Sequence, residues 1–326
     1  MTNALAEAIR SEVATPLRGV FYPLGLPIEI TTNSPAILQA AEQSWGDHAP
    51  RYALPMLQVR VIASEDGDGL PPPPTPAWSM DGHMLYLDAG DGNYAVANMR
   101  EGHGTIYVTR AATSNLLYLR YHFIESVVMI LISSRHAMPL HSACVSFRGK
   151  GMLFWGAPGA GKTTLAYACA RAGWTYTADD SCYVLHGATQ GRVIGNARKV
   201  RFRPAAKALF PELQGYELTP RTEGKPSIEI PTAELPGLIT SDEARVEYVI
   251  FLHRKPTDRA WLVPLGLDTT LQRFHTDFYD PAEIRTRQAS ILSSFANVKG
   301  FELHYETLTQ AIDKLEQLAN SGGSAR

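Results

Sequence analysis

Residues 151–173 read GMLFWGAPGAGKTTLAYACARAG, and this stretch decides the fold. An apolar run, Gly151–Trp155, leads directly into Gly156–Thr163, which satisfies the pattern G-x-x-x-x-G-K-[ST] in full. The next residues predict a helix over Thr164–Ala172, and Gly173 is a natural stop for it. A glycine-rich loop between a strand and a helix is typical of a phosphate-binding site.

Each residue type in this loop suits phosphate chemistry. The glycines allow backbone conformations that direct consecutive amide N–H groups at a phosphate, and the following helix directs its positive end at the same anion. Lys162 would supply a cation to the β- and γ-phosphates, and the Thr163 hydroxyl would bind Mg²⁺. We therefore predict a nucleotide site made by Gly156, Ala157, Pro158, Gly159, Ala160, Gly161, Lys162, Thr163 and Thr164.

Two acidic residues follow the next predicted strand. Trp174–Ala178 (WTYTA) is β-prone and ends at Asp179 and Asp180. Beside a phosphate loop, one carboxylate can hold magnesium and the other can accept the proton of an attacking hydroxyl; the alternative is an exposed acidic turn. Two neighbouring carboxylates do not titrate independently, so giving one role to each acid assumes one particular protonation state of the pair. His141, fifteen positions before Gly156, is by itself more typical of a structural histidine.

The flanking segments predict alternating strands and helices. Ala143–Phe147 and Gly151–Trp155, joined by Arg148-Gly149-Lys150, predict a hairpin. Apolar residues recur every three or four positions in Asn115–Arg135, which predicts a core-facing helix. Further strands are predicted at Leu26–Ile30, Met84–Leu87, Thr105–Val108, Lys199–Arg203, Tyr248–Leu252 and Ala260–Pro264. Further helices are predicted from Ser34-Pro35, from Asp280-Pro281 to about Asn297, and over Ala311–Ala319 behind a capping box of Thr307 and Gln310. The alternation favours an α/β fold.

Composition limits the class of partner. The 326 residues carry 30 Lys plus Arg against 32 Asp plus Glu, a net charge of −2, so no overall basic field exists to hold nucleic acid or an anionic membrane. The N-terminus lacks the pattern of a secretory signal. The longest apolar run, Val127–Ile132, is far shorter than the roughly 20 residues of a membrane span. We expect a cytoplasmic protein that binds neither nucleic acid nor membrane.

The cysteines and two lone histidines are predicted to be structural. Cys144, Cys169 and Cys182 lie far apart, without the spacing of a metal site or of a disulfide framework, which fits a reducing compartment. His253 and His275 stand alone in the sequence, and we expect both to pack as ordinary structural residues.

The segment LHSACVSFRGKGMLFWGAPGAGKTTLAYACARAGWTYTADD resembles the HPr kinase/phosphorylase family over about Pro139–Leu185. The resemblance implies a phosphate-loop kinase core related to that of phosphoenolpyruvate carboxykinase. It also implies ATP and Mg²⁺ as cofactors, a serine hydroxyl of a protein as acceptor, and a homo-oligomer. Four residues take roles by this resemblance: His141 and Lys162 belong to the catalytic site, Asp180 is the proton acceptor, and Asp179 lies beside it. Thr163 and Asp179 would hold the metal.

One region departs from the family pattern. The family's Glu-Ile-Arg-Gly signature after the second aspartate is missing, and GNARKVRFRP stands there, with Arg198, Lys199, Arg201 and Arg203. The N-terminal region, with GLPIEITTNSPAIL at residues 25–38, is more similar to divergent relatives of the family, some of which phosphorylate peptides in biosynthetic gene clusters. If KVRFR is a strand, its basic side chains share one face, which would hold an acidic or phosphorylated acceptor or face solvent. Arg221 and Lys225 are candidates for a lid that supplies a cation.

These observations predict an α+β region at residues 1–135, a kinase domain at 136–320 and a flexible tail at 321–326. The run PPPPTP at Pro71–Pro76 predicts an extended connector that divides the N-terminal region. The predicted function is an ATP- and magnesium-dependent kinase acting on a hydroxyl, a serine of a protein or peptide. The alternatives are a small-molecule kinase with the same chemistry and a regulatory module that binds and slowly hydrolyses ATP.

Overall fold

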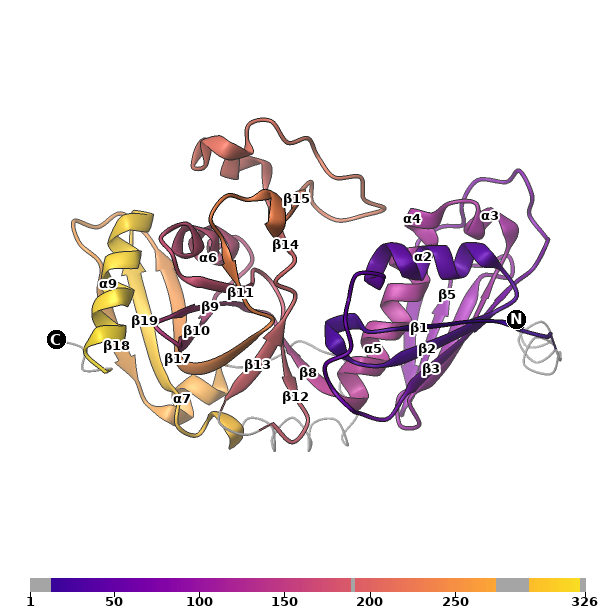
Figure 1. Cartoon of the computed structure of the whole chain (residues 1–326), viewed down its shortest axis with the longest axis horizontal. Coiled ribbons are helices and arrows are strands. Elements are labelled where there is room, and N and C mark those ends of the chain that lie inside the picture. The colour runs from indigo at the N-terminus through magenta and orange to yellow at the C-terminus, as the bar shows by residue number, and fades with distance from the viewer. Residues whose placement is uncertain (1–12, 189–190, 274–292, 323–326) are drawn as a thin grey trace. The chain divides into compact units, whose positions relative to one another are not determined.

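The computed structural model describes residues 13–188, 191–273 and 293–322, and the chain divides into two compact units, Met1–Ala137 and Met138–Arg326 (Figure 1). The predicted boundary between residues 135 and 136 lies two residues from this division, and the roles assigned to the two parts stay predictions. The helix predicted from Asp280-Pro281 lies mostly outside the described residues; the part of it that is described contains a short 3₁₀ helix, Ser293–Phe295. The part of the predicted tail beyond residue 322 also lies outside the described residues.

The N-terminal unit is built on one seven-stranded mixed sheet in the order β1-β2-β3-β7-β6-β5-β4. The strands are β1 (Leu17–Phe21), β2 (Ile28–Thr32), β3 (Leu57–Ala63), β4 (Ala77–Asp81), β5 (Met84–Asp88), β6 (Tyr94–Asn98) and β7 (His103–Val108). Strands on both sides of Pro71–Pro76 join this sheet. The prediction that the proline run divides the region is therefore wrong, because pairing of β3 with β7 closes the sheet across it.

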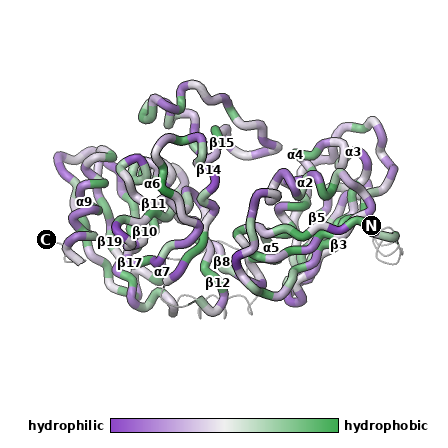
Figure 2. The backbone as a smooth tube through the Cα atoms, viewed as in Figure 1, coloured by the Kyte–Doolittle hydropathy of each residue, from purple (hydrophilic) through white to green (hydrophobic). Residues whose placement is uncertain are grey.

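Helices cover this sheet: α2 (Pro35–Trp45), α3 (Arg110–Thr113), α4 (Leu116–Leu119) and α5 (Ser126–Arg135), with a π-helical turn at Arg120–Glu125. The predicted helix over 115–135 is confirmed as the continuous run of α4, the π turn and α5. By length and composition Leu116–Arg135 could cross a membrane, with a mean hydropathy of 1.5, and half of that stretch is buried in the protein. A buried core helix passes the same test of length and composition. Figure 2 shows that hydrophobic and hydrophilic residues alternate along the backbone of both units.

The C-terminal unit contains a ten-stranded sheet in the order β16-β11-β9-β10-β17-β13-β12-β8, with β19 paired to β17 and β18 paired to β19. Its strands are β8 (Ala137–Leu140), β9 (Ala143–Phe147), β10 (Lys150–Trp155), β11 (Thr175–Ala178), β12 (Cys182–Leu185), β13 (Arg192–Gly195), β16 (Ile239–Thr240), β17 (Glu243–Arg254), β18 (Trp261–Leu265) and β19 (Lys299–Tyr305). Two further strands, β14 (Lys199–Phe202) and β15 (Ile228–Pro231), form a separate pair.

The described residues of this unit form three α-helices: α6 (Lys162–Arg171), α7 (Leu267–Gln272) and α9 (Leu308–Asn320). Both α6 and α9 pack on one apolar cluster that includes Phe154, Ile250 and Leu303. The capping box of α9 is confirmed, because the Thr307 hydroxyl accepts the Gln310 N–H and the Gln310 side chain accepts the Thr307 N–H. The prediction of a mixed α/β architecture is confirmed.

The predicted hairpin is confirmed as β9 and β10, in which Phe147 pairs with Lys150 across the two-residue turn Arg148-Gly149. Both turn residues have positive φ, +50° and +79°, as a type I′ turn requires. Arg148 tolerates this conformation less well than glycine, and its side chain is held by a hydrogen bond to Asn320.

Gly149→Ala should destabilise the protein by about 1 kcal/mol, because a side chain is strained at positive φ. An added Cβ at this position meets no atom within 4 Å, so the cost comes from the backbone alone. Gly215→Ala is the matched control, since its Cβ also enters open space but its φ lies outside the left-handed region. Urea unfolding midpoints measure both variants, and equal midpoints would contradict the turn assignment.

Candidate functional site

Strand order brings three segments of the C-terminal unit to one edge of its sheet. Strands β10 and β11 both run antiparallel to β9, which lies between them, so β10 and β11 end where β9 begins. The glycine-rich loop follows β10, and Asp179 and Asp180 follow β11. His141 lies two residues before β9. The fold thereby gathers residues that are 38 and 39 positions apart in the sequence.

The loop enters α6 in a form that suits an anion. Gly159 and Gly161 have φ of +90° and +94°, conformations that only glycine adopts readily. Helix α6 has Gly161 as its N-cap, with no side-chain capping bond and no acidic residue in its first turn. No capping side chain therefore occupies the amide groups that begin the helix. Ala157, Pro158 and Gly159 are exposed at the tip, and Thr164 lies half-buried in the first turn.

Lys162, His141 and Asp180 form a chain of contacts. The Lys162 amino group donates to the Gly156 carbonyl oxygen at 2.7 Å and lies 3.2 Å from His141 Nε2. His141 Nδ1 lies 3.5 Å from Asp180 Oδ1. Burial lowers the pKa of Lys162, an effect that the negative charge of Asp180 opposes. Only 6% of Lys162 is exposed, whereas 46% of the Asp180 side chain is exposed to solvent.

The side chain of Thr163 is hydrogen-bonded to the main chain of Asp179. Its hydroxyl donates to the Asp179 carbonyl oxygen at 3.3 Å, while Asp179 Oδ2 accepts the Arg201 N–H at 2.7 Å. Burial raises the pKa of Asp179 to about 6; the Arg201 N–H lowers it and the charge of Asp180 raises it. The carboxyl group of Asp179 is thus hydrogen-bonded to the main chain of β14, whereas the carboxyl group of Asp180 contacts His141.

The predicted basic strand is confirmed as β14, but its basic side chains already have partners. Lys199 Nζ, Arg201 Nε and Arg221 Nη1 lie 3.0, 2.8 and 2.8 Å from the carboxylate of Glu229. Arg203 instead donates to the main-chain carbonyl oxygens of Lys225 and Pro226. The expected basic face does reach solvent, since 47% of the Lys199 side chain and 36% of the Arg201 side chain are exposed, but both side chains are already paired with an opposite charge on the neighbouring strand.

Glu229 is the residue of this region that sequence reasoning missed. It lies directly opposite Arg201 in the pairing of β14 with β15. The alternating run IEIP at 228–231, with its single acid, is the signal from which an oppositely charged partner strand can be inferred.

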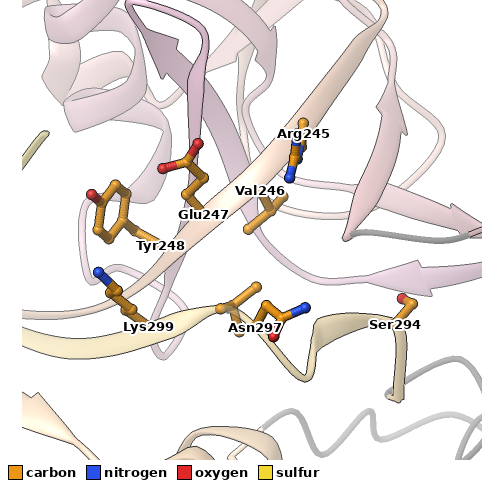
Figure 3. Close-up of a pocket in the computed structure, with 8 residues that line it drawn as sticks. Arg245, Val246, Glu247, Tyr248, Ser294, Asn297 and Lys299 are labelled. Carbon is orange, nitrogen blue, oxygen red and sulfur yellow. The ribbon is translucent and has the colours of Figure 1, made fainter. Parts of the chain in front are cut away.

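The structure also describes the three cysteines and a cavity of the C-terminal unit. All three cysteines are free and buried, as predicted, and His275 lies outside the described residues. Across residues 13–188, 191–273 and 293–322, no group of three or more His, Cys, Asp or Glu side chains is arranged to hold a metal ion. A cavity of about 290 Å³ is lined by Arg245, Glu247, Tyr248 and Lys299 at the starts of β17 and β19, the opposite end of these parallel strands from the loop (Figure 3).

Comparison with known proteins gives partial matches. The family model described as "SynChlorMet cassette protein ScmC" matches residues 107–194, a span that is less than half of the chain but includes the loop and both aspartates. No curated protein matches the sequence. The solved structure of the Hpr(Ser) kinase/phosphatase from Coxiella burnetii is similar at 14% identity and a TM-score of 0.30, covering 57% of this chain and 99% of that one. This is a weak structural relation, and it fixes neither the family nor the chemistry of this chain.

Proposed function

We propose that this chain is a kinase that uses ATP and Mg²⁺ to transfer the γ-phosphate to a hydroxyl group, a serine of a protein or peptide. The observation that supports this best is the contact chain from Lys162 through His141 to Asp180, with separations of 3.2 and 3.5 Å, at the end of a complete phosphate-loop sequence. A cation for the phosphates and a base for the hydroxyl are thereby adjacent, as phosphoryl transfer requires.

The residues of the loop fit a nucleotide with magnesium. The uncapped start of α6 and the positive φ of Gly159 and Gly161 leave room for phosphate oxygens against main-chain amides. Magnesium, when bound, neutralises charge on the β- and γ-phosphates. The Thr163 hydroxyl and the Asp179 carboxylate are the groups of this chain that would hold it, and Lys162 would bind the phosphates directly.

Asp180 is the group that would accept the proton. In the transfer, the acceptor oxygen forms a bond to the γ-phosphorus while the bond from that phosphorus to the β-phosphate oxygen breaks, and the hydroxyl proton passes to Asp180. His141 holds the Asp180 carboxylate on one side and Lys162 on the other, so it positions both. The exposed side of Asp180 leaves access for a large acceptor such as a polypeptide.

Incubation with γ-labelled ATP, Mg²⁺ and a lysate of the source cells tests the proposal. We expect label on the serine of a polypeptide with the wild-type chain and none with Lys162→Ala, because the variant lacks the phosphate-binding cation. Label only in small molecules would favour a small-molecule kinase. ATP binding without any labelled acceptor would favour a regulatory module, and failure of the wild-type chain to bind ATP would overturn all three.

A further inference from the structure

Tyr305 is the last residue of β19, at the edge of the sheet where the glycine-rich loop begins. Strands β10, β17 and β19 are parallel, and Tyr305 pairs with Arg254, the last residue of β17. Phe301, Leu303 and Tyr305 occupy alternate positions of β19, and all three belong to the apolar cluster on which α6 packs. The Tyr305 side chain therefore lies on the α6 face of the sheet.

The hydroxyl group of Tyr305 lies against the turn that leads from the loop into α6. A Cβ added to Gly161 would lie 3.4 Å from this hydroxyl oxygen, and Ala160 packs against the same apolar cluster as the Tyr305 ring. Gly161 is the N-cap of α6 and has a φ of +94°. The hydroxyl group is thus the side-chain polar group of β19 that the loop meets at this turn.

This hydroxyl group is buried without a partner. The Tyr305 side chain is fully buried, and within the described part of the chain its hydroxyl makes no hydrogen bond. Burial raises the pKa of Tyr305 to about 12, so the phenol keeps its proton at neutral pH and can donate it. A buried hydroxyl without a partner costs free energy, whereas the ring of phenylalanine would fill the same space without that cost. Packing alone therefore does not account for the hydroxyl.

Other buried tyrosines of the protein do have partners. The Tyr167 hydroxyl donates to Glu212 at 2.8 Å, and the Tyr176 hydroxyl donates to the carbonyl oxygen of Lys199 at 3.1 Å. Buried polar groups are normally paired in this way, and an exception calls for an explanation. The exception here lies beside the loop predicted to bind phosphate.

We propose that Tyr305 is a positioning residue of the loop, whose hydroxyl forms a hydrogen bond with the main chain at Gly161 when the phosphates of a nucleotide bind. This inference rests on the proposed function and extends it to a residue outside the loop. Phosphate oxygens accept hydrogen bonds from consecutive loop amides and so select one conformation of the loop. A hydrogen bond made only in that conformation strengthens binding, because it is absent from the ligand-free state.

Binding of Mg·ATP and of Mg·tripolyphosphate to the full chain, measured by calorimetry, tests the role of the hydroxyl. We expect Tyr305→Phe to weaken both about fivefold, the scale of one hydrogen bond. Both should weaken equally, because the loop holds the phosphates that the two probes share.

Tyr248→Phe is the matched control. Tyr248 is buried in the same apolar cluster, but it pairs with Lys299 at the opposite end of β19 and lines the cavity of Figure 3. Its substitution removes a phenol hydroxyl from the same face of the sheet, far along the strands from the loop. We expect wild-type affinity for both probes.

Urea unfolding without ligand separates a positioning role from a structural one. Tyr305→Phe should unfold at the wild-type midpoint or above it, because no hydrogen bond is lost from the ligand-free protein. A lower midpoint would overturn the inference, since the hydroxyl would then already have a partner before any phosphate binds.

Two binding results would also overturn the inference while the proposed function stands. One is wild-type affinity for both probes in Tyr305→Phe when Lys162→Ala loses them. The other is a loss of ATP binding alone, which would connect the hydroxyl with the nucleoside and not with the loop. A wild-type chain that binds neither probe would overturn the inference together with the proposed function.

Discussion

Asp180→Asn should bind ATP as the wild-type chain does and transfer phosphate about 10² to 10⁴ times more slowly, the usual contribution of a general base. The substitution keeps the size and hydrogen-bonding shape of the side chain but removes its ability to accept a proton. The loop contacts of Lys162 with Gly156 do not involve this carboxylate, so the phosphate site should persist. Calorimetry measures ATP affinity, and single-turnover transfer of labelled phosphate measures the rate.

Asp313→Asn provides the matched control for this change. Asp313 is exposed on α9, so its substitution removes one negative charge without touching the loop edge. We expect the control to transfer phosphate at the wild-type rate. Equal turnover in Asp180→Asn and in the control would remove Asp180 from the proton-acceptor role, and would turn attention to Asp179 as the other acid of the pair.

Glu229→Gln should destabilise the protein by about 2 kcal/mol, because removing one member of a partly buried charge cluster leaves the others unpaired. The carboxylate of Glu229 is 16% exposed and contacts Lys199, Arg201 and Arg221 within 3.0 Å. The expected loss is smaller than for a fully buried pair, since solvent reaches Lys199. Glu223→Gln, an exposed acid near Arg221, is the control with the same change in charge.

The effect of Glu229→Gln should depend on pH. Burial would raise the pKa of Glu229, but the charges of Lys199, Arg201 and Arg221 outweigh it and hold the pKa below 4.5. The stabilisation is therefore present above pH 4.5 and is lost as the pH falls through the lower value of the folded state. Urea unfolding from pH 7 down to pH 3 should show the gap between wild type and variant closing. A gap that stays constant, or a Glu229→Gln midpoint equal to that of Glu223→Gln, would contradict the charge cluster.

Local chemistry made several elements predictable from the sequence. The turn residues Arg148-Gly149 between two β-prone runs define the hairpin, and Thr307 with Gln310 defines the start of α9. Within the loop at 156–163, Gly159 and Gly161 mark the positions where φ is positive, because glycine is favoured there. In these cases the deciding residues lie within a few positions of one another.

Pairing between distant segments was not predictable in the same way. Arg201 and Glu229 are 28 positions apart and meet only because β14 and β15 pair across an irregular segment. Likewise, strands on both sides of Pro71–Pro76 share one sheet because β3 pairs with β7, which no local pattern encodes. The approach of His141 to Asp180 depends on β9 lying between β10 and β11, again a matter of strand order.

Strand β17 shares its hydrogen bonds with β13 near its beginning and with β10 and β19 farther along. Its amides can exchange with solvent only when several ladders open together, so its protection should report the global opening of the C-terminal unit and no local fraying. The cavity beside Arg245 and the imidazole of His253 sit at opposite ends of this one strand. Because one continuous strand joins them, the molecule keeps the spacing between them for as long as that unit remains folded.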